Sequence, residues 1–336
     1  MKRYKVGILG ATGAVGREML NILEEYKVPI DSLKLFASQK SVGKQISFNE
    51  KEYMVEEANE ESFQGLDFVL GAASNQIAKK YKDSIVQSGA IFIDNSSAFR
   101  MDDTVPLVVP EINGEDAFSH KGVIANPNCS TIIALMAISG ISRLSKIKSI
   151  VASTYQATSG AGAAGPVELK EQMRALLEHK EIKNSVFPYQ IVDNLIPQIG
   201  NFIENGYTTE EMKMQNEGRK IMHLPQLKVD CTCVRVPVPR SHSISLMVCT
   251  EDNLSIEDIK REISLSKGCK LLDNPDEFLY PMPIHTSNQD LVYVGRIRKS
   301  LINENAVCLW CCGDQVRKGA ATNAVQIMMK LIGLKY

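Results

Sequence analysis

A glycine-rich turn between a short apolar run and an amphipathic segment restricts the fold of this chain more than any other feature. The run YKVGILG leads into GATGAVG, where Gly10, Gly13 and Gly16 stand at the opening of the helical pattern GREMLNILEEY. Glycines allow a tight turn and a close approach of the backbone to a pyrophosphate, which the helix N-terminus attracts. The spacing is GxxGxxG rather than GxGxxG, so a turn needed only for packing is the alternative. The loop residues expected to contact a dinucleotide are Gly10, Ala11, Thr12, Gly13, Ala14 and Val15.

Strand and helix patterns alternate through the first 128 residues. Short apolar runs end in small or polar residues at LKLFAS, LDFVLGAA, AIFIDNSS and GVIANP. This alternation predicts an α/β domain with a Rossmann-type parallel sheet, whose ligands bind at the carboxyl ends of the strands. From about Ile147, longer strand patterns with few helices predict a second, α+β domain with a mixed or mostly antiparallel sheet. The predicted domains are residues 1–128, joined by the last helix at about 316–336, and residues 129–315.

Charge and cysteine usage exclude several classes of function. The chain has 38 Lys and Arg against 39 Asp and Glu, without a long basic run, so neither nucleic acid nor a membrane is an expected partner. The longest apolar run, residues 132–141, is too short to span a bilayer. Eight cysteines without an export signal fit a reducing cytoplasm. The CxxC of Cys308 and Cys311 has no partner pair at zinc-site spacing, so we expect buried strand cysteines and no metal.

The end of the second strand pattern bears on which cofactor binds. Folds that prefer NAD usually place an acid there, where it binds the ribose hydroxyls. Here the strand LKLFAS ends in Ser38, Lys40 and Ser41, with no acid. Two hydroxyls and an ammonium suit a 2′-phosphate, so NADP is favoured, although a solvated turn would contain the same residue types.

Cys129 is the most informative cysteine. It lies in ANPNCSTIIALMAISG, between the end of a strand and an apolar helix. The helix dipole lowers the pKa of a thiol at the helix N-terminus, and the backbone N–H groups there can bind an oxyanion. A buried unreactive cysteine is the default alternative for any one of the eight. We predict that Cys129 is a nucleophile.

His242 is the histidine best suited to assist this thiol. It lies in CVRVPVPRSHSIS, between two strand patterns and close to Arg235 and Arg240. A single histidine is more often a surface or core residue. Arg235, seven residues earlier at the edge of the same sheet, would add an anion clamp beside a proton shuttle.

Together these segments resemble the aspartate-semialdehyde dehydrogenase family, in its bacterial branch, over essentially the whole chain. The resemblance rests on GATGAVG, FASQKS, NSSAFR, NPNCST, TYQATSGAG, EEMKM, CVRVPVPRSHS and DQVRKGAATNAVQI, in that order. It implies the NADP-dependent reductive dephosphorylation of L-aspartyl 4-phosphate to L-aspartate 4-semialdehyde through a Cys129 thioester. This reaction would serve lysine, threonine, methionine and isoleucine biosynthesis. The resemblance also implies a homodimer or a dimer-based tetramer, with the second domain both catalytic and dimerising.

The resemblance further implies a role for each matched residue. Cys129 would be the nucleophile, His242 the general acid–base, and Gln156 the group that orients the intermediate. Arg235 would bind the substrate carboxylate and Glu210 its ammonium. The spacing of Thr208 and Glu211 predicts a capping box, so Glu211 is expected to have a structural role. The phosphate would be held by Arg100, Lys213 and Asn128. The cofactor would be lined by Ser159, Gly160 and Gly162, with Gln315 at the nicotinamide amide. Lys40 stands where many relatives have Arg, which weakens the expectation of strict NADP preference.

Two other functions remain open at this point. N-acetylglutamyl-phosphate reductase shares the fold, the cysteine and the cofactor, but its substrate has no free ammonium for Glu210. A cofactor-binding protein without catalysis would be expected to have lost the nucleophile or the base, and Cys129 and His242 are both present.

Overall fold

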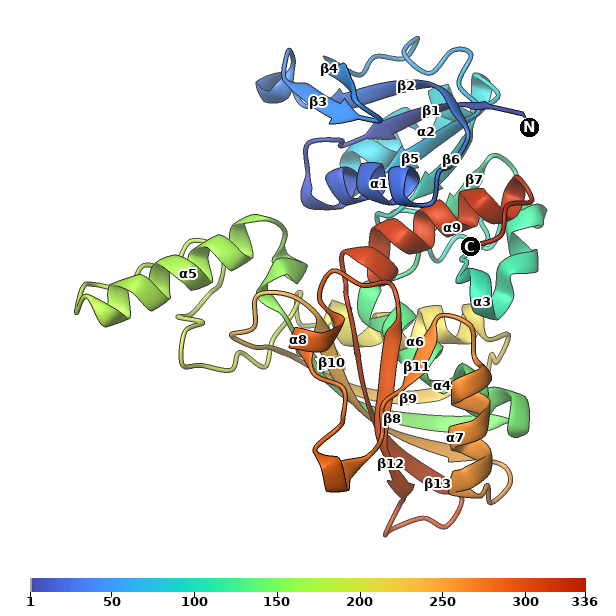
Figure 1. Ribbon diagram of the computed structural model, residues 1–336, viewed down its shortest axis with the longest axis vertical. Helices are drawn as coiled ribbons and strands as arrows, with labels where there is room; N and C mark the ends of the chain where they lie inside the picture. Colours follow the sequence, from blue (N-terminus) through green and yellow to red (C-terminus); the bar gives the residue numbers. More distant parts are fainter. Residues whose placement is uncertain (1) are drawn as a thin grey trace. The chain divides into compact units, whose positions relative to one another are not determined.

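The computed structural model describes residues 2–336, which form two compact units (Figure 1). The first unit comprises the chain up to Asn128 together with Ala320–Tyr336, and the second is Cys129–Gly319. Residues 316–319, assigned above to the first domain, therefore lie in the second unit. The reason is local: the side chain of Asp314 accepts hydrogen bonds from the backbone N–H groups of Val316 and Arg317, and its carbonyl accepts one from Gly319.

The first unit is built on a seven-stranded sheet in the order β3-β4-β2-β1-β5-β6-β7. All neighbouring strands are parallel except β3 and β4. The strands are β1 (Tyr4–Leu9), β2 (Ile30–Ala37), β3 (Gln45–Phe48), β4 (Lys51–Glu57), β5 (Phe68–Gly71), β6 (Ile91–Asp94) and β7 (Val123–Ala125). The helical segments are α1 (Ala14–Glu25), η1 (Gln39–Ser41), α2 (Asn75–Gln87), α3 (Pro110–Asn113), η2 (Gly114–Ser119) and α9 (Thr322–Leu331). This is the Rossmann-type sheet that the alternating pattern predicts.

Both faces of this sheet are covered, as consecutive residues of β2 show. Leu35 packs in the core cluster that contains residues of α1 and α9, whereas Phe36 meets the ring of Phe63, which in turn meets Tyr81 of α2. Leu35 and Phe36 are both fully buried. Neighbouring side chains of a strand point to opposite faces, so helices must cover both sides. The last helix of the chain thus completes the core of the first unit.

The second unit is built on a six-stranded mixed sheet in the order β11-β12-β13-β10-β8-β9. Strand β10 is antiparallel to both β13 and β8, whereas β8 and β9 are parallel. The strands are β8 (Ile147–Gln156), β9 (Lys228–Arg235), β10 (His242–Thr250), β11 (Cys269–Leu271), β12 (Val292–Lys299) and β13 (Ala306–Gly313). The helical segments are α4 (Cys129–Leu144), η3 (Thr158–Ala161), α5 (Ala164–Leu177), α6 (Thr209–Ile221), α7 (Ile256–Leu265), η4 (Pro275–Glu277), α8 (Pro283–Thr286) and the π-helical turn η5 (Arg317–Ala321).

The apolar helix α4 forms the centre of the second unit. Residues 130–141 are buried, and the helix packs against the sheet and against α6 and α7. On β8 the side chains of Ile150 and Ala152 are buried, while Val151 between them is 43% exposed. Helices therefore cover one face of this part of the sheet. None of the helices in residues 2–336 is long and apolar enough to cross a membrane.

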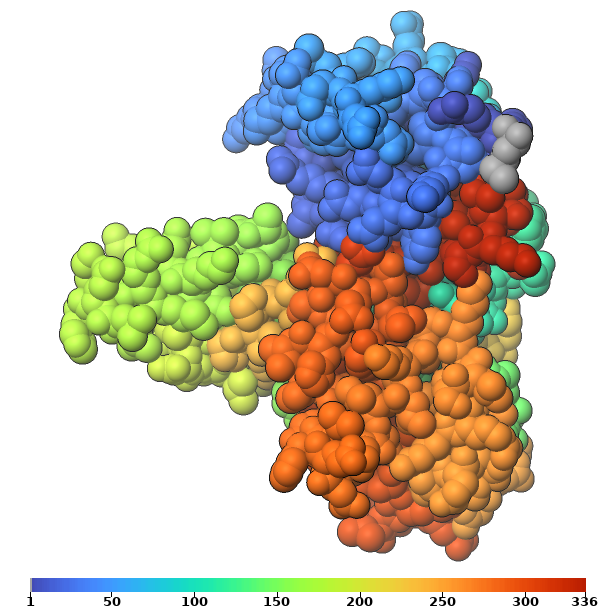
Figure 2. Space-filling view, in the orientation of Figure 1, coloured from blue at the N-terminus to red at the C-terminus, as the bar shows by residue number. Residues whose placement is uncertain are grey.

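Helix α5 projects from the body of the second unit, followed by a long irregular segment that returns to it (Figures 1 and 2). Glu168 of α5 ties the two together, because its carboxylate accepts hydrogen bonds from the backbone of Ser185, Val186 and Phe187. Burial raises the pKa of Glu168, but the hydroxyl of Ser185 and these backbone N–H groups outweigh it and hold the pKa below its usual value. The irregular segment is thereby ordered without forming a helix or a strand.

Two glycines of the loop at the start of α1 differ in how closely the backbone approaches them. A Cβ at Gly16 would overlap the carbonyl oxygen of Gly10, whereas a Cβ at Gly13 would meet that oxygen at 3.4 Å. Gly13 has a φ of −74°, which suits alanine. We expect Gly16→Ala to lower the free energy of unfolding by about 1–3 kcal/mol, because the helix must move off the loop.

Gly13→Ala is the matched control and should change the free energy of unfolding by less than about 1 kcal/mol. Unfolding by urea, followed by circular dichroism, measures both. Equal midpoints for the two variants would show that the close approach at Gly16 does not constrain the loop.

Candidate active site

Several residues that the sequence analysis predicts to be reactive lie at one edge of the mixed sheet. Parallel pairing sets Gln156, the last residue of β8, opposite Arg235, the last residue of β9. Strand β10 runs the other way, so its first residue, His242, reaches the same edge and pairs with Gly313 at the end of β13. Residues far apart in sequence therefore meet because of strand direction and register.

Cys129 and His242 form the centre of this edge. Cys129 is the first residue of α4 and is half-buried. Its Sγ lies 3.5 Å from Nε2 of His242, which is fully buried. A thiol at a helix N-terminus beside an imidazole is an arrangement suited to nucleophilic attack on a carbonyl carbon.

The surroundings of His242 keep its imidazole neutral. Nδ1 accepts a hydrogen bond from the backbone N–H of Ala157 at 3.0 Å. Burial, followed by the positive charge of Arg235, lowers the pKa of His242 to about 3, with only Glu210 acting in the opposite direction.

Arg235 is a buried cation at the same edge. Its Nη1 donates to the carbonyl of Ala157 at 2.7 Å, and its guanidinium lies 5.9 Å from the ring centre of Phe187. Burial lowers the pKa of Arg235, and charge on Cys129 and Glu210 opposes that effect. The bond to Ala157 uses one of five N–H donors, so other N–H groups of the guanidinium can bind a carboxylate as well.

Glu210, Lys213 and Gln156 form a chain of polar contacts beside Arg235. Glu210 and Lys213 lie three residues apart on α6 and form an ion pair with Nζ 2.7 Å from Oε2. The other oxygen of Glu210 accepts from Nε2 of Gln156 at 3.3 Å. Glu211 makes the expected capping box with Thr208 and also accepts from the backbone N–H of Cys233. Glu210 faces the site while Glu211 holds the helix in place.

Gly160 lies against the reactive pair because it has no side chain. A Cβ at this position would stand 2.6 Å from Nη1 of Arg235 and 3.1 Å from Cε1 of His242. The neighbouring Ser159 accepts a hydrogen bond from Nε2 of Gln315. The segment predicted to line a cofactor thus borders the reactive residues and contacts Gln315.

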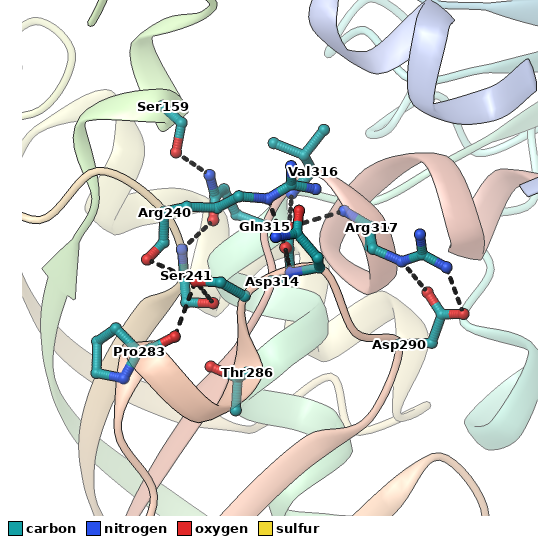
Figure 3. Close-up of polar contacts among 12 residues, drawn as sticks. Ser159, Arg240, Ser241, Pro283, Thr286, Asp290, Asp314, Gln315, Val316 and Arg317 are labelled. Carbon is teal, nitrogen blue, oxygen red and sulfur yellow. Dashed lines mark hydrogen bonds and ion pairs between the residues drawn. The ribbon is translucent and has the colours of Figure 1, made fainter. Parts of the chain in front are cut away.

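The buried carboxylate of Asp314 organises the loop that carries Gln315 (Figure 3). Its Oδ2 accepts from Nε of Arg240 at 2.6 Å and from the backbone N–H of Asn288 at 2.7 Å. The next residue, Gln315, accepts through Oε1 from the backbone N–H of Ser241 at 2.9 Å. Ser241 has a φ of +73°, in the left-handed region that disfavours side chains. These contacts hold the backbone that enters His242.

Gly162 ends η3 in the second unit, with a φ of +88°, and the other remaining predicted residues belong to the first unit. The glycine loop and the end of β2 meet there, with Oγ1 of Thr12 lying 3.5 Å from Oγ of Ser41. Nζ of Lys44 lies 3.5 Å from the same Ser41 oxygen. Hydroxyls and an ammonium thus gather at the carboxyl edge of the parallel sheet, which fits a phosphate group. Lys40 and Ser38 are exposed beside them.

Arg100 and Asn128 are also buried in the first unit. Arg100 donates through Nη2 to the carbonyl of Asn95 at 2.9 Å, which fixes its guanidinium on the loop after β6. Asn128 immediately precedes Cys129 in the chain.

Four residues of these sites were not singled out by the sequence. They are Lys44, Ala157, Ser241 and Asp314. Lys44 stands within a few residues of Lys40, and Asp314 directly precedes Gln315, so proximity was a signal for both. Ala157 acts through its backbone and Ser241 through its φ angle, and a sequence pattern reports neither.

The other cysteines are free thiols. Cys231 and Cys233 are buried on β9 with their sulfur atoms 3.7 Å apart, and Cys311 and Cys312 are buried on β13. Burial raises the pKa of Cys311 and raises that of Cys312 to about 11, which keeps both protonated and unreactive. Across residues 2–336, no group of three His, Cys, Asp or Glu side chains is arranged to hold a metal ion.

Comparison with known families gives a match in each unit. Residues 5–120 match the family described as semialdehyde dehydrogenase, NAD binding domain. Residues 139–318 match the semialdehyde dehydrogenase, dimerisation domain.

Individual relatives match nearly end to end. The chain is 48% identical to the aspartate-semialdehyde dehydrogenase of Aquifex aeolicus, over 98% of each chain, and 45% identical to that of Bacillus subtilis, over 97% of this chain and 96% of the relative. The crystal structure of aspartate semialdehyde dehydrogenase II complexed with ASA from Vibrio cholerae has a TM-score of 0.97 at 39% identity and covers 100% of both chains.

Because the pKa of His242 is lowered, we expect the free energy of unfolding to fall as the solution becomes more acidic. The unfolded chain binds a proton at this histidine below about pH 6.5, whereas the folded chain does so only near pH 3. Stability from this group is therefore complete above about pH 6.5 and falls as the pH drops toward 3. Between pH 7 and pH 5 the wild type should lose about 2 kcal/mol more than the His242→Gln variant.

Urea unfolding at the two pH values measures this difference. Equal losses in wild type and variant would mean that His242 is not held neutral in the folded protein. His223→Gln, which replaces an exposed histidine, is the control and should lose as much stability between the two pH values as the wild type.

Proposed function

Because this chain belongs to the aspartate-semialdehyde dehydrogenase family, we propose that it reduces L-aspartyl 4-phosphate to L-aspartate 4-semialdehyde through a thioester on Cys129, with NADP as its cofactor. The observation that carries the proposal is the contact of Cys129 Sγ with Nε2 of His242 at a helix N-terminus, beside the buried cation Arg235. The same chemistry run backwards requires inorganic phosphate as the acceptor of the acyl group.

The substrate would be held by groups of opposite charge to its own. A planar guanidinium at Arg235 would bind the α-carboxylate with two hydrogen bonds, and Glu210 would pair with the α-ammonium. Lys213, now paired with Glu210, would share in holding the phosphate together with Arg100 and Asn128. The requirement for a carboxylate facing an ammonium favours an aspartyl over an N-acylated glutamyl substrate.

Each reactive residue would act at the substrate carbonyl. The Cys129 thiolate would attack the carbonyl carbon, and Gln156 and His242 would contact the resulting tetrahedral adduct. Loss of phosphate from that adduct leaves the thioester. When bound, the nicotinamide supplies or accepts a hydride at the same carbon.

We propose that NADP lies along the glycine loop, with its 2′-phosphate near Ser38, Lys40 and Ser41. The observation in favour is the grouping of Thr12, Ser41 and Lys44 described above. Gln315, fixed by Ser159 and Ser241, would meet the nicotinamide amide.

The proposed setting follows from the family. The second unit matches a dimerisation domain, so a homodimer or a dimer of dimers is proposed. The compartment would be a reducing cytoplasm, which keeps Cys129 as a thiol. The product would supply lysine, threonine, methionine and isoleucine biosynthesis.

The first experiment measures NADPH formation from L-aspartate 4-semialdehyde and NADP, with and without inorganic phosphate. Each measurement is repeated with NAD. We expect formation to depend on phosphate and to be faster with NADP. Full activity without phosphate would mean that water takes the acyl group, and faster reaction with NAD would overturn the assignment of the 2′-phosphate site.

Replacing the nucleophile tests the thioester. Cys129→Ala should abolish turnover because no other group supplies the sulfur, while the binding of NADP, followed by fluorescence titration, should persist. Cys249→Ala, at a half-buried cysteine far along β10 from His242, is the control and should retain activity. Retained turnover in Cys129→Ala would remove the proposed mechanism.

The carboxylate clamp is tested by Arg235→Lys. This change keeps the charge but removes bidentate geometry, so kcat/KM for the semialdehyde should fall by about 10- to 100-fold, mostly through KM. Steady-state kinetics measure the effect. A silent change would place the substrate carboxylate elsewhere.

A further inference from the structure

Three asparagine side chains form a hydrogen-bonded chain at the carboxyl edge of the parallel sheet. Asn95 directly follows β6, and Asn126 directly follows the neighbouring strand β7. Nδ2 of Asn126 donates to Oδ1 of Asn95 at 2.6 Å, and Nδ2 of Asn323 donates to Oδ1 of Asn126 at 2.7 Å. Asn126 and Asn323 are both fully buried. Helix α9, which carries Asn323, is therefore bonded to the loops that follow two strands.

Backbone carbonyls fix the orientation of the two buried amides. Nδ2 of Asn323 also donates to the carbonyl of Val108 at 2.9 Å, and Nδ2 of Asn126 to that of Ala320 at 3.3 Å. A carbonyl oxygen only accepts, so a rotated amide would set oxygen against oxygen at these contacts. The oxygen of Asn126 must therefore face the N–H of Asn323. Because a buried polar group without its partner is costly, this arrangement resists rotation.

The network supports two residues that we propose to hold the phosphate. The carbonyl of Asn95 accepts from Nη2 of Arg100 at 2.9 Å, so a shift of Asn95 would move the guanidinium. Asn126 stands two residues before Asn128 and three before Cys129. The backbone N–H of Asn126 and both ends of its side-chain amide are bonded, which fixes the start of this short loop.

The segment that leads into α9 also packs on the nucleophile. A Cβ at Gly319 would stand 2.9 Å from the Cβ of Cys129 and 3.3 Å from its Cα, both within the second unit. Four residues later, Asn323 bonds to Asn126 within the first unit. The two ends of this segment thus contact the two ends of the loop that enters α4.

We propose that Asn323 is a positioning residue for the phosphate site, which acts by holding Asn126 and, through it, the loops that carry Arg100 and Asn128. This inference deepens the proposed function and rests on it for the identity of phosphate as the acyl acceptor.

The other end of the substrate should not depend on this network. Its carboxylate and ammonium would bind Arg235 and Glu210, which belong to the second unit and are held by the mixed sheet and α6. Loss of the Asn323 amide should therefore weaken the binding of phosphate and spare that of the semialdehyde.

The closing experiment measures the Michaelis constants in phosphate-dependent NADPH formation by the full-length enzyme. Asn323→Ala should raise KM for inorganic phosphate by about 10- to 30-fold, the effect expected when a buried hydrogen-bond partner is removed. KM for the semialdehyde should stay within about threefold.

Val325→Ala is the matched control on the same helix. Val325 is fully buried in the core of the first unit, so this variant should also be less stable to urea. Its KM for phosphate should stay within about twofold of the wild type, because no hydrogen bond of the network is lost.

A double-mutant cycle tests whether Asn323 acts through Asn126. Asn126→Ala alone should raise KM for phosphate at least as much as Asn323→Ala does. In that background Asn323→Ala should add less than about twofold, because the two residues belong to one network. Two effects that multiply in full would show that Asn323 acts by another route.

Asn95→Ala replaces Asn323→Ala in the same assays if the latter fails to fold. Asn95 is half-buried, and the change removes its side-chain acceptor but keeps the carbonyl that binds Arg100. We expect KM for phosphate to rise by about 3- to 10-fold.

Protection of Cys129 gives a readout without turnover. Phosphate bound beside the thiol should slow alkylation by iodoacetamide, and the concentration for half protection should rise in Asn323→Ala by the same factor as KM. If phosphate protects Cys129 but the semialdehyde is not oxidised, the proposed function fails while the positioning role is still measured.

Four results would overturn the inference. They are an unchanged KM for phosphate in Asn323→Ala, an equal rise in Val325→Ala, an equal rise for phosphate and semialdehyde, and a wild-type enzyme whose Cys129 phosphate does not protect. If Asn323→Ala does not fold, an unchanged KM for phosphate in Asn95→Ala has the same meaning.

Discussion

The register of the mixed sheet is the constraint on which the rest of the reactive site depends. Strands β8 and β9 run parallel and end level with each other, so Gln156 and Arg235 are neighbours. Strand β10 runs antiparallel and begins at the same edge, which sets His242 opposite Gly313. A slip of one residue in any of these pairings would turn the side chains to the other face of the sheet. The positions of the imidazole and the guanidinium therefore depend on backbone hydrogen bonds made along four strands, β8, β9, β10 and β13.

Two buried groups that would each be costly alone are stabilised by what surrounds them. Arg235 at 6% exposure keeps its charge because the Ala157 carbonyl, Glu210 and Cys129 lie near it. His242 at zero exposure is neutral, since a second charge beside Arg235 would add to the cost of burial. The single residue Ala157 serves both, donating its N–H to His242 and offering its carbonyl to Arg235. One residue thus orients both side chains, while burial and the charge of Arg235 keep the imidazole neutral.

Much of this arrangement could be predicted from the sequence, for reasons that differ from residue to residue. The Rossmann-type sheet follows from alternating patterns and the glycine turn, because these are local features. The capping box of Thr208 and Glu211 follows from a spacing of three residues and is confirmed. The last helix was expected from about residue 316, and the chain forms a π-helical turn at Arg317–Ala321 that continues as α9 from Thr322. Asp314 caps that turn through local hydrogen bonds from the backbone N–H groups of Val316 and Arg317, while its carboxylate is held in place by Arg240 and Asn288 from other parts of the chain.

The sequence by itself determined which residue types are present for the chemistry. The position of Cys129 between a strand and a helix, and of His242 between two strands, singled out one of the eight cysteines and one of the five histidines, and the family resemblance supported that choice. The tertiary structure alone decided the protonation of His242. A sequence shows that an imidazole is available, but its proton is placed by a backbone N–H that carries no side-chain signature, and its charge is set by burial and by an arginine from another strand. Hydrogen-bond direction and desolvation act through space, so they exist only once the strands have paired.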